Sequence, residues 1–150
     1  MAEQKKVVVK KSIQEIKFVG DYTPQYATEG SACFDLEVSE KTRIQPGEFE
    51  LVDLGIKMEI PKGYYVEIVP RSSICKSGLV LANSVGVIDS DFRGSIKAPL
   101  RNVTDKKIIV LPGSHLVQAM LKPIIKFPFK KVSKLSETAR GEGGFGSTGK

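Results

Sequence analysis

A chain of 150 residues is long enough for one hydrophobic core and short for two. A hydrophobic content of 41% with 27% charged residues is ordinary for a globular domain and excludes a largely disordered chain. The 23 basic and 17 acidic residues leave a formal charge of +6, which suits nucleic acid, an anionic membrane or a small polyphosphate without selecting among them.

The sequence contains no segment that predicts export or membrane insertion. No apolar run approaches the roughly 18 to 20 residues of a membrane span, and Val7 to Val9 is too short for the apolar core of a signal peptide. Cys33 and Cys75 have neither C-x-x-C spacing nor a histidine cluster beside them, so we expect no disulfide and no zinc site. We therefore expect a cytoplasmic protein, in the host cytoplasm if its source is viral.

Short apolar runs alternate with turn signals along most of the chain. Pro46-Gly47, Pro61-Lys-Gly63 and Pro112-Gly113 each join a fixed proline φ to a permissive glycine. This spacing of apolar runs and turns predicts an all-β sandwich or barrel. The runs are Ile13 to Phe18, Ala32 to Val38, Phe49 to Met58, Tyr64 to Val69, Val85 to Ile88, Ile96 to Leu100, Ile108 to Leu111 and His115 to Leu121.

One segment, Pro70-Arg-Ser-Ser-Ile-Cys-Lys-Ser-Gly78, interrupts the β pattern. Its proline and two serines predict the start of a helix of one to two turns, which ends at Lys76 before a glycine. Such a start presents N–H groups and hydroxyls beside Arg71 and attracts phosphate. A plain capped turn is the alternative that this segment leaves open.

A second cluster lies at Asn83 to Gly94. The pattern predicts a strand from Val85 to Ile88 within a hairpin that offers backbone donors and acceptors to a base, with Asp89 following at a turn. Asp89 is then either an Asx-type turn residue or a general base that orients and deprotonates water. The second role depends more on whether the carboxylate lies within hydrogen-bond distance of that water than on an unusual pKa.

The final segment, Arg140-Gly-Glu-Gly-Gly-Phe-Gly-Ser-Thr-Gly-Lys150, has no apolar periodicity. Glycine lets N–H groups turn toward an anion, arginine can bind phosphate, and Phe145 can stack on a flat heterocycle. The segment therefore predicts either a lid over a phosphorylated base or a flexible tail. We expect a β domain over residues 1–135 and a flexible glycine-rich arm over residues 136–150.

Five segments together resemble the homotrimeric dUTPase family. In order they are Gly30-Ser-Ala-Cys-Phe-Asp35-Leu36, then Pro70-Arg71-Ser72-Ser73 with Lys76 and Gly78, then Gly86 to Gly94, then His115-Leu-Val-Gln118, and the tail from Arg140. Each motif is weakly specific, but five in the right order are very specific. The resemblance implies a distorted β-sandwich of the jelly-roll type with one short helix, assembled as a homotrimer with active sites shared between subunits.

The resemblance also implies the reaction and its residues. The family hydrolyses dUTP to dUMP and pyrophosphate, which limits uracil incorporation into DNA and supplies dUMP for thymidylate synthesis. Asp89 matches the residue that activates the water attacking the α-phosphorus, and Asp35 matches a carboxylate that touches the cofactor, Mg²⁺, through water. Matches to phosphate contacts are Arg71, Ser72, Ser73 and Gln118.

The remaining matched positions surround the base and sugar. Asn83, Val87, Ile88 and Lys97 match positions around uracil and its sugar, largely through main-chain atoms. The arm that closes over nucleotide at a neighbouring subunit is matched by Arg140, Phe145, Gly146, Ser147 and Thr148. We expect no nucleic-acid or membrane partner.

Three positions depart from the family pattern. Phe92 stands where tyrosine is usual beneath the deoxyribose, so we expect sugar discrimination to survive without the tyrosine hydroxyl. His115 replaces a common arginine, and we expect it to pack or hydrogen-bond rather than catalyse. Cys33 stands where glycine is frequent, and we expect it to be buried and inert.

Two other functions remain as alternatives. A dCTP deaminase shares this fold and some phosphate-binding features, but the aspartate segment and the aromatic, glycine-rich arm argue against it. A basic nucleic-acid-binding module would explain the charge of +6, but no recognition helix or aromatic-interleaved basic strand is visible.

Overall fold

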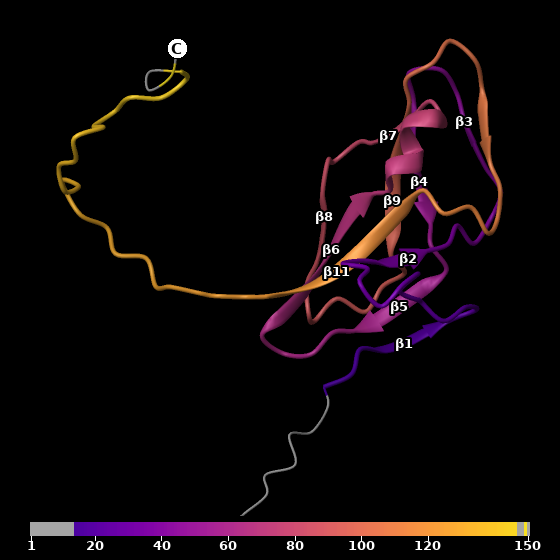
Figure 1. Cartoon of the computed structure of the whole chain (residues 1–150), viewed down its shortest axis with the longest axis horizontal. Helices are drawn as coiled ribbons and strands as arrows, with labels where there is room; N and C mark the ends of the chain where they lie inside the picture. The colour runs from indigo at the N-terminus through magenta and orange to yellow at the C-terminus, as the bar shows by residue number, and fades with distance from the viewer. Residues whose placement is uncertain (1–13, 147–148, 150) are drawn as a thin grey trace, which may run out of the picture.

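The computed structural model describes residues 14–146 and 149 of the chain. Within these residues eleven strands and one short 3₁₀ helix form the body (Figure 1). The strands are β1 (Lys17–Gly20), β2 (Phe34–Leu36), β3 (Thr42–Ile44), β4 (Phe49–Asp53), β5 (Ile56–Glu59), β6 (Tyr64–Pro70), β7 (Leu79–Leu81), β8 (Gly86–Ile88), β9 (Lys97–Asn102), β10 (Ile108–Val110) and β11 (Val117–Pro123). The helix η1 spans Ser72–Lys76.

Antiparallel pairing organises these strands into two main sheets and two ribbons. The larger sheet has the order β2-β11-β6-β8, the smaller has the order β4-β9-β7, and the ribbons are β1-β5 and β3-β10. The described residues contain no α-helix. The prediction of an all-β fold with one short helix is confirmed.

Side-chain alternation places the core between the sheets. In β6 the buried residues Val66 and Ile68 alternate with half-buried neighbours, and in β9 Ala98 and Leu100 alternate with Lys97 and Pro99. The inward-facing residues of both sheets form one cluster. The core therefore follows directly from the period-two pattern, and it holds the ends of β6, β8 and β9 in fixed positions.

The strand pattern departs most from the sequence prediction in three places. The apolar run from Phe49 to Met58 is divided into β4 and β5, because Gly55 adopts a φ of +61° and its N–H donates to Asp53 Oδ1 at 2.7 Å. Strands β3 and β7 have three residues each, too few for their alternation to stand out in the sequence.

The chain leaves the body after β11. Residues beyond Pro123 form no strand in the described part of the chain and extend away from the sheets (Figure 1). Ile125, Phe127 and Phe129 alternate along this segment, and all three side chains are exposed. The predicted division of the chain at residue 135 stays a prediction.

None of the helices in the described residues is long and apolar enough to span a membrane.

Candidate active site

A polar cluster forms where β2, β11 and β6 lie side by side. Because β11 lies between the other two strands, Gln118 is paired with Asp35 on one side and with Val69 on the other. Arg71, which follows β6, places Nε 3.1 Å from Asp35 Oδ1, and Gln118 Nε2 donates to the carbonyl of Pro70 at 3.2 Å. The structure thus brings together three residues that the sequence assigns to phosphate and metal.

The helix η1 begins beside this cluster. Arg71 is its N-cap, with extended backbone, and the Arg71 N–H donates to the carbonyl of Leu116 at 3.0 Å. Ser72 and Ser73 lie in the first turn with exposed side chains, and the N-cap makes no side-chain hydrogen bond. The predicted short helix is present as a 3₁₀ helix that starts at Ser72 and ends at Lys76, with Arg71 in the N-cap position.

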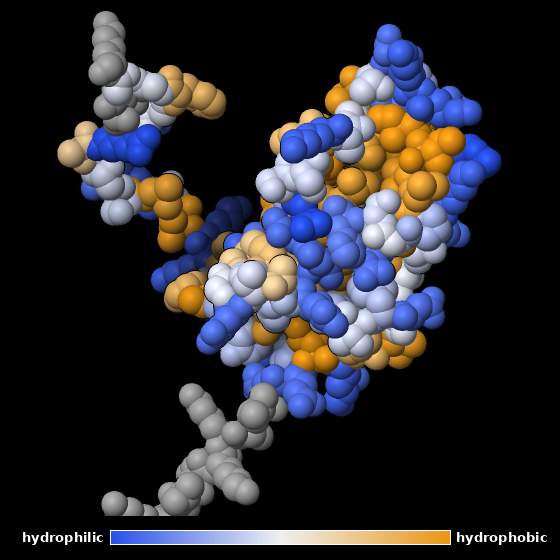
Figure 2. Space-filling view, turned by 45° about the vertical axis from the view of Figure 1, so that its right-hand side comes forward, coloured by the Kyte–Doolittle hydropathy of each residue, from blue (hydrophilic) through white to orange (hydrophobic). Residues whose placement is uncertain are grey.

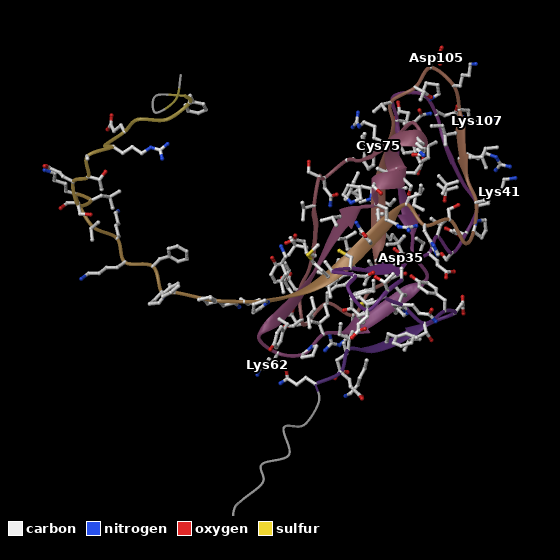
Figure 3. All side chains as sticks on the ribbon, in the orientation of Figure 1. Asp35, Lys41, Lys62, Cys75, Asp105 and Lys107 are labelled. Atoms are coloured by element: carbon white, nitrogen blue, oxygen red, sulfur yellow. The ribbon has the colours of Figure 1, made fainter. Side chains whose placement is uncertain are left out.

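A second ion pair borders the cluster. His115 Nε2 lies 3.4 Å from Glu37 Oε1, and the His115 carbonyl accepts a hydrogen bond from Arg71 Nη1 at 3.4 Å. Glu37 is two residues beyond Asp35 and directly follows the end of β2. Glu37 was not predicted from the sequence, although the i,i+2 spacing of the two carboxylates was the available signal. Figure 3 shows Asp35 within the body, below the helix that carries Cys75.

A pocket of about 90 Å³ lies at the seam between the two main sheets. All four residues assigned to uracil and its sugar line it: Asn83, Val87, Ile88 and Lys97. A Cβ on Gly86 would lie 3.2 Å from Ile68 Cβ, so glycine allows β8 to approach β6 closely at this point. The structure therefore brings these four positions together around one pocket.

The prediction of a hairpin around this pocket is wrong. β8 pairs with β6 in the larger sheet, whereas β7 pairs with β9 in the smaller one. The chain crosses from one sheet to the other through Asn83 to Val85, where Ser84 has a φ of +63°. The pocket is consequently walled by two sheets rather than by one hairpin.

Asp89 and Phe92 lie in the loop that follows β8. Asp89 is exposed, and its carbonyl accepts a hydrogen bond from the Phe92 N–H at 3.2 Å. The Phe92 ring packs over Gly94, where a Cβ would come within 2.6 Å of the ring. Among the described residues no ion pair or hydrogen bond joins Asp89 to Arg71 or Gln118.

Asp53, which is paired in register with Lys97, has a shifted pKa. Burial acts to raise the pKa of Asp53, but hydrogen bonds from the Gly55 N–H and Ser95 Oγ, together with the charge of Lys97, outweigh it and lower the pKa. Asp53 is thus an anion tied to the loop that precedes β9 and paired in register with Lys97.

Cys33 is half-buried, so the expectation that it is buried is wrong. Its burial raises the pKa of the thiol, and the negative charges of Asp35 and Glu67 add to this shift. The neutral thiol is a poor nucleophile, which agrees with the expectation that Cys33 is inert.

The glycine-rich arm does not reach the rest of the site in this structure. Arg140 Nε donates to the carbonyl of Gly143 at 2.9 Å, and the Phe145 side chain is fully exposed. Gly146 has a φ of +90°. Figure 1 shows the described part of the arm lying apart from the strands of the body, and Ser147 and Thr148 lie outside the described residues.

No group of three or more histidine, cysteine, aspartate or glutamate side chains that could hold a metal occurs in the described ranges. Asp35 is the matched carboxylate, and its side chain is about one-fifth exposed, at 22%. Arg71 engages Oδ1 of Asp35. A single accessible carboxylate suits contact with a hydrated Mg²⁺, which keeps several of its own waters, better than direct enclosure of the ion.

Sequence comparison identifies the family. The dUTPase family model matches residues 22–149. The deoxyuridine 5'-triphosphate nucleotidohydrolase of Chlamydia pneumoniae is 42% identical over 134 residues, which cover 87% of this chain and 92% of that protein. The enzyme of the same name from Brucella melitensis biotype 2 is 45% identical over 131 residues, 84% of this chain and 83% of the relative.

Solved structures support the same assignment. The dUTPase of Streptococcus mutans superposes with a TM-score of 0.70 at 34% identity and covers 77% of this chain and all of its own. The dUTPase of Staphylococcus bacteriophage 80alpha, solved with dUpNHpp, gives a TM-score of 0.82 over 90% of this chain and 98% of its own. At 21% identity that second similarity supports the fold alone. The chain belongs to the dUTPase family, and the predicted jelly-roll-like fold and the predicted enzyme class, dUTP diphosphatase, are confirmed.

Proposed function

We propose that this chain hydrolyses dUTP to dUMP and pyrophosphate, with water attacking the α-phosphorus and Mg²⁺ assisting. The observation that carries the proposal is the pocket at the sheet seam, where four matched nucleoside positions meet, with Asp89 directly after the strand that lines it. In the cell this reaction would limit uracil incorporation into DNA and supply dUMP for thymidylate synthesis.

The polar cluster around Arg71 would bind the triphosphate. The Arg71 guanidinium, the hydroxyls of Ser72 and Ser73, and the Gln118 amide all offer donors to phosphate oxygens. Asp35 would hold a hydrated Mg²⁺ through water. When bound, the ion supplies charge neutralisation on the phosphates and on the pyrophosphate leaving group. A structural Mg(II) ion is described for the dUTPase of phage phi11 of S. aureus, which has a TM-score of 0.75 to this chain at 17% identity.

Asp89 would orient the attacking water and accept its proton. The carboxylate directly follows β8, which is paired with β6, so the start of the loop that carries Asp89 is anchored to the larger sheet. General-base catalysis contributes roughly 10² to 10⁴ to rates of this kind, and positioning of the phosphate supplies much of the remainder.

The seam pocket would select uracil through backbone groups. Uracil offers an N3–H donor and an O4 acceptor, whereas cytosine reverses both. A backbone edge matched to uracil would leave unpaired polar groups against cytosine, and discrimination on the order of 10⁴ follows from such losses. Thymine would be rejected sterically at its methyl group, and the flat face of Phe92 would exclude a 2′-hydroxyl.

A homotrimer with shared sites would explain surfaces that a single subunit leaves exposed. Ile125, Phe127 and Phe129 alternate on a segment that leaves its own body, and Phe49 and Leu51 are exposed on the outer face of the β4-β9-β7 sheet. Figure 2 shows a broad apolar area on the body, bordered by hydrophilic side chains. Apolar surfaces of this kind mark sites of protein contact. A neighbouring subunit would then bring the arm, with Arg140, Phe145, Gly146, Ser147 and Thr148, over the nucleotide.

A pyrophosphate-release assay with Mg²⁺ across the deoxy- and ribonucleoside triphosphates tests this function. We expect release from dUTP, with dCTP, dTTP and UTP at least about 10²-fold poorer substrates. Release of ammonia from dCTP would instead identify a deaminase. Tight binding to DNA at physiological salt without any turnover of dUTP would favour the nucleic-acid-binding alternative. The cytoplasmic location stays a prediction.

A further inference from the structure

The loop from Asp89 to Gly94 carries both the proposed base, Asp89, and the proposed sugar-facing ring, Phe92. It joins β8 of one sheet to β9 of the other and belongs to neither. Most of its side chains are exposed, and one backbone hydrogen bond, from the Phe92 N–H to the Asp89 carbonyl, closes its first turn at 3.2 Å. Precise placement of Asp89 and Phe92 therefore requires a further constraint.

Arg93 supplies such a constraint from within the loop. Its guanidinium folds back, and Nη1 donates to the carbonyl of Ser90 at 2.7 Å and to the carbonyl of Phe92 at 3.0 Å. One of these acceptors lies directly after Asp89, and the other belongs to Phe92 itself. Both bonds leave the same nitrogen, whose two N–H donors diverge within the plane of the guanidinium, so they hold the two carbonyls around one point.

Two features of the surroundings of Arg93 favour this folded position. The Phe92 ring lies over Gly94, which has no Cβ to displace it. In addition, Arg93 and Glu59 of the β1-β5 ribbon line the same cleft, and Glu59 Oε1 accepts a hydrogen bond from Lys17 Nζ at 3.1 Å. That hydrogen bond and the charge of Lys17 lower the pKa of Glu59, and the charge of Arg93 lowers it further, so Glu59 is an anion that attracts Arg93.

We propose that Arg93 is a positioning residue for the hydrolysis of dUTP: by holding the carbonyls of Ser90 and Phe92, it fixes the loop that presents Asp89 to the water and Phe92 to the sugar. The inference rests on the proposed function and adds to it a residue that contacts neither phosphate nor base. Because the pocket and the Arg71 cluster do not include Arg93, its loss affects turnover and sugar selection more than affinity for nucleotide.

The test compares Arg93→Met and Arg93→Ala with the wild-type enzyme. We expect kcat for dUTP to fall about tenfold, which is the usual effect of losing a hydrogen bond from a charged donor, with KM changed less than about twofold. The preference for dUTP over UTP falls as well, because the Phe92 backbone is released. Arg93→Lys restores part of both quantities, since an ammonium group can still donate to one carbonyl. If the alanine variant does not fold, the methionine variant, whose stem fills the same space, carries the test.

Arg101→Met is the matched control. Arg101 is also exposed and donates through Nη1 to a loop carbonyl, that of Gly47, at 3.2 Å. We expect it to leave kcat and the dUTP to UTP ratio unchanged. If Arg93→Met lowers only thermal stability and leaves both quantities at wild-type values, the positioning role is wrong. If the wild-type chain itself releases no pyrophosphate from dUTP, the proposed function fails instead, so the two failures are distinguishable.

Discussion

At the scale of single residues, the proposed chemistry depends on one exposed carboxylate and one exposed ring in the same loop. Asp89 and Phe92 are both accessible to a ligand, and each projects from backbone that is held by the pairing of β8 and by the contacts of Arg93. The proposed role of both residues therefore depends on where their side chains are positioned. Substitutions that keep the size of the side chain separate an effect on the chemical step from an effect on nucleotide binding.

We predict that Asp89→Asn retains nucleotide binding while kcat for dUTP falls by roughly 10² to 10⁴, because the amide cannot accept the proton of the attacking water. Steady-state pyrophosphate release and titration with a non-hydrolysable dUTP analogue measure the two quantities. Asp91→Asn, two residues away in the same exposed loop, is the control and should behave as wild type. Unchanged turnover in the Asp89 variant would remove this residue from the mechanism.

Phe92→Ala should erode the preference for dUTP over UTP by at least about tenfold, because the ring that excludes the 2′-hydroxyl is lost. The ratio of kcat/KM for the two substrates measures this effect. Phe92→Tyr keeps the flat face and should retain the ratio. Equal ratios in the alanine variant and the wild type would mean that the ring does not select the sugar.

At the scale of strands and loops, the sequence predicted the elements with clear alternation and failed where long-range pairing decides the structure. The runs that became β6, β9 and β11 and the helix at Ser72–Lys76 were found. The division of Phe49 to Met58 depends on the positive φ of Gly55, which apolar spacing does not reveal. The predicted hairpin was wrong because β7 and β8 each pair with a strand distant in sequence.

The candidate site was predictable to a similar degree. Arg71, Gln118 and Asp35 carry recognisable motifs, and the structure brings them together. The contributions of Glu37 and Arg93 were missed, because each depends on a contact with a backbone or side-chain group that only the fold places nearby.

The Asn102 side chain links β9 to β3 and to the loop that follows β9, so its replacement should lower the stability of the fold. This fully buried side chain donates to the carbonyls of Ile44 and Lys106 at 3.0 and 2.7 Å and accepts from the Thr104 N–H at 2.9 Å. We predict that Asn102→Leu lowers the free energy of unfolding by roughly 3 kcal/mol, because buried backbone groups lose their partners. Denaturant titration measures the change, and Val103→Ala at the exposed neighbouring position is the control. A loss below about 1 kcal/mol would contradict this account of how β9 is tied to the β3-β10 ribbon.

At the scale of the whole molecule, the exposed apolar segment after β11 favours an assembly of several copies. The apolar side chains of Ile125, Phe127 and Phe129 lie outside the body of their own subunit. The described residues of the arm beyond them contribute no side chain to the core cluster. We infer that residues 124–135 support assembly and that residues from Arg140 onward serve the reaction.

Truncation before Arg140 should therefore leave a folded trimer and abolish most activity. Sedimentation equilibrium measures the oligomeric state, and pyrophosphate release measures the activity. Phe145→Ala in the full-length chain is a milder companion variant that removes only the stacking ring, and we expect it to lie between the truncated and wild-type proteins. A fully active truncated protein would show that the arm is a tail without a role in hydrolysis.

The central claim is that water attacks the innermost phosphorus of the nucleotide. Turnover of dUTP in water enriched in the heavy oxygen isotope, followed by mass spectrometry of the products, tests it most directly. The account predicts one labelled oxygen in dUMP and none in pyrophosphate. Label in pyrophosphate with unlabelled dUMP would mean that water attacks a different phosphorus, and the proposed mechanism would be wrong.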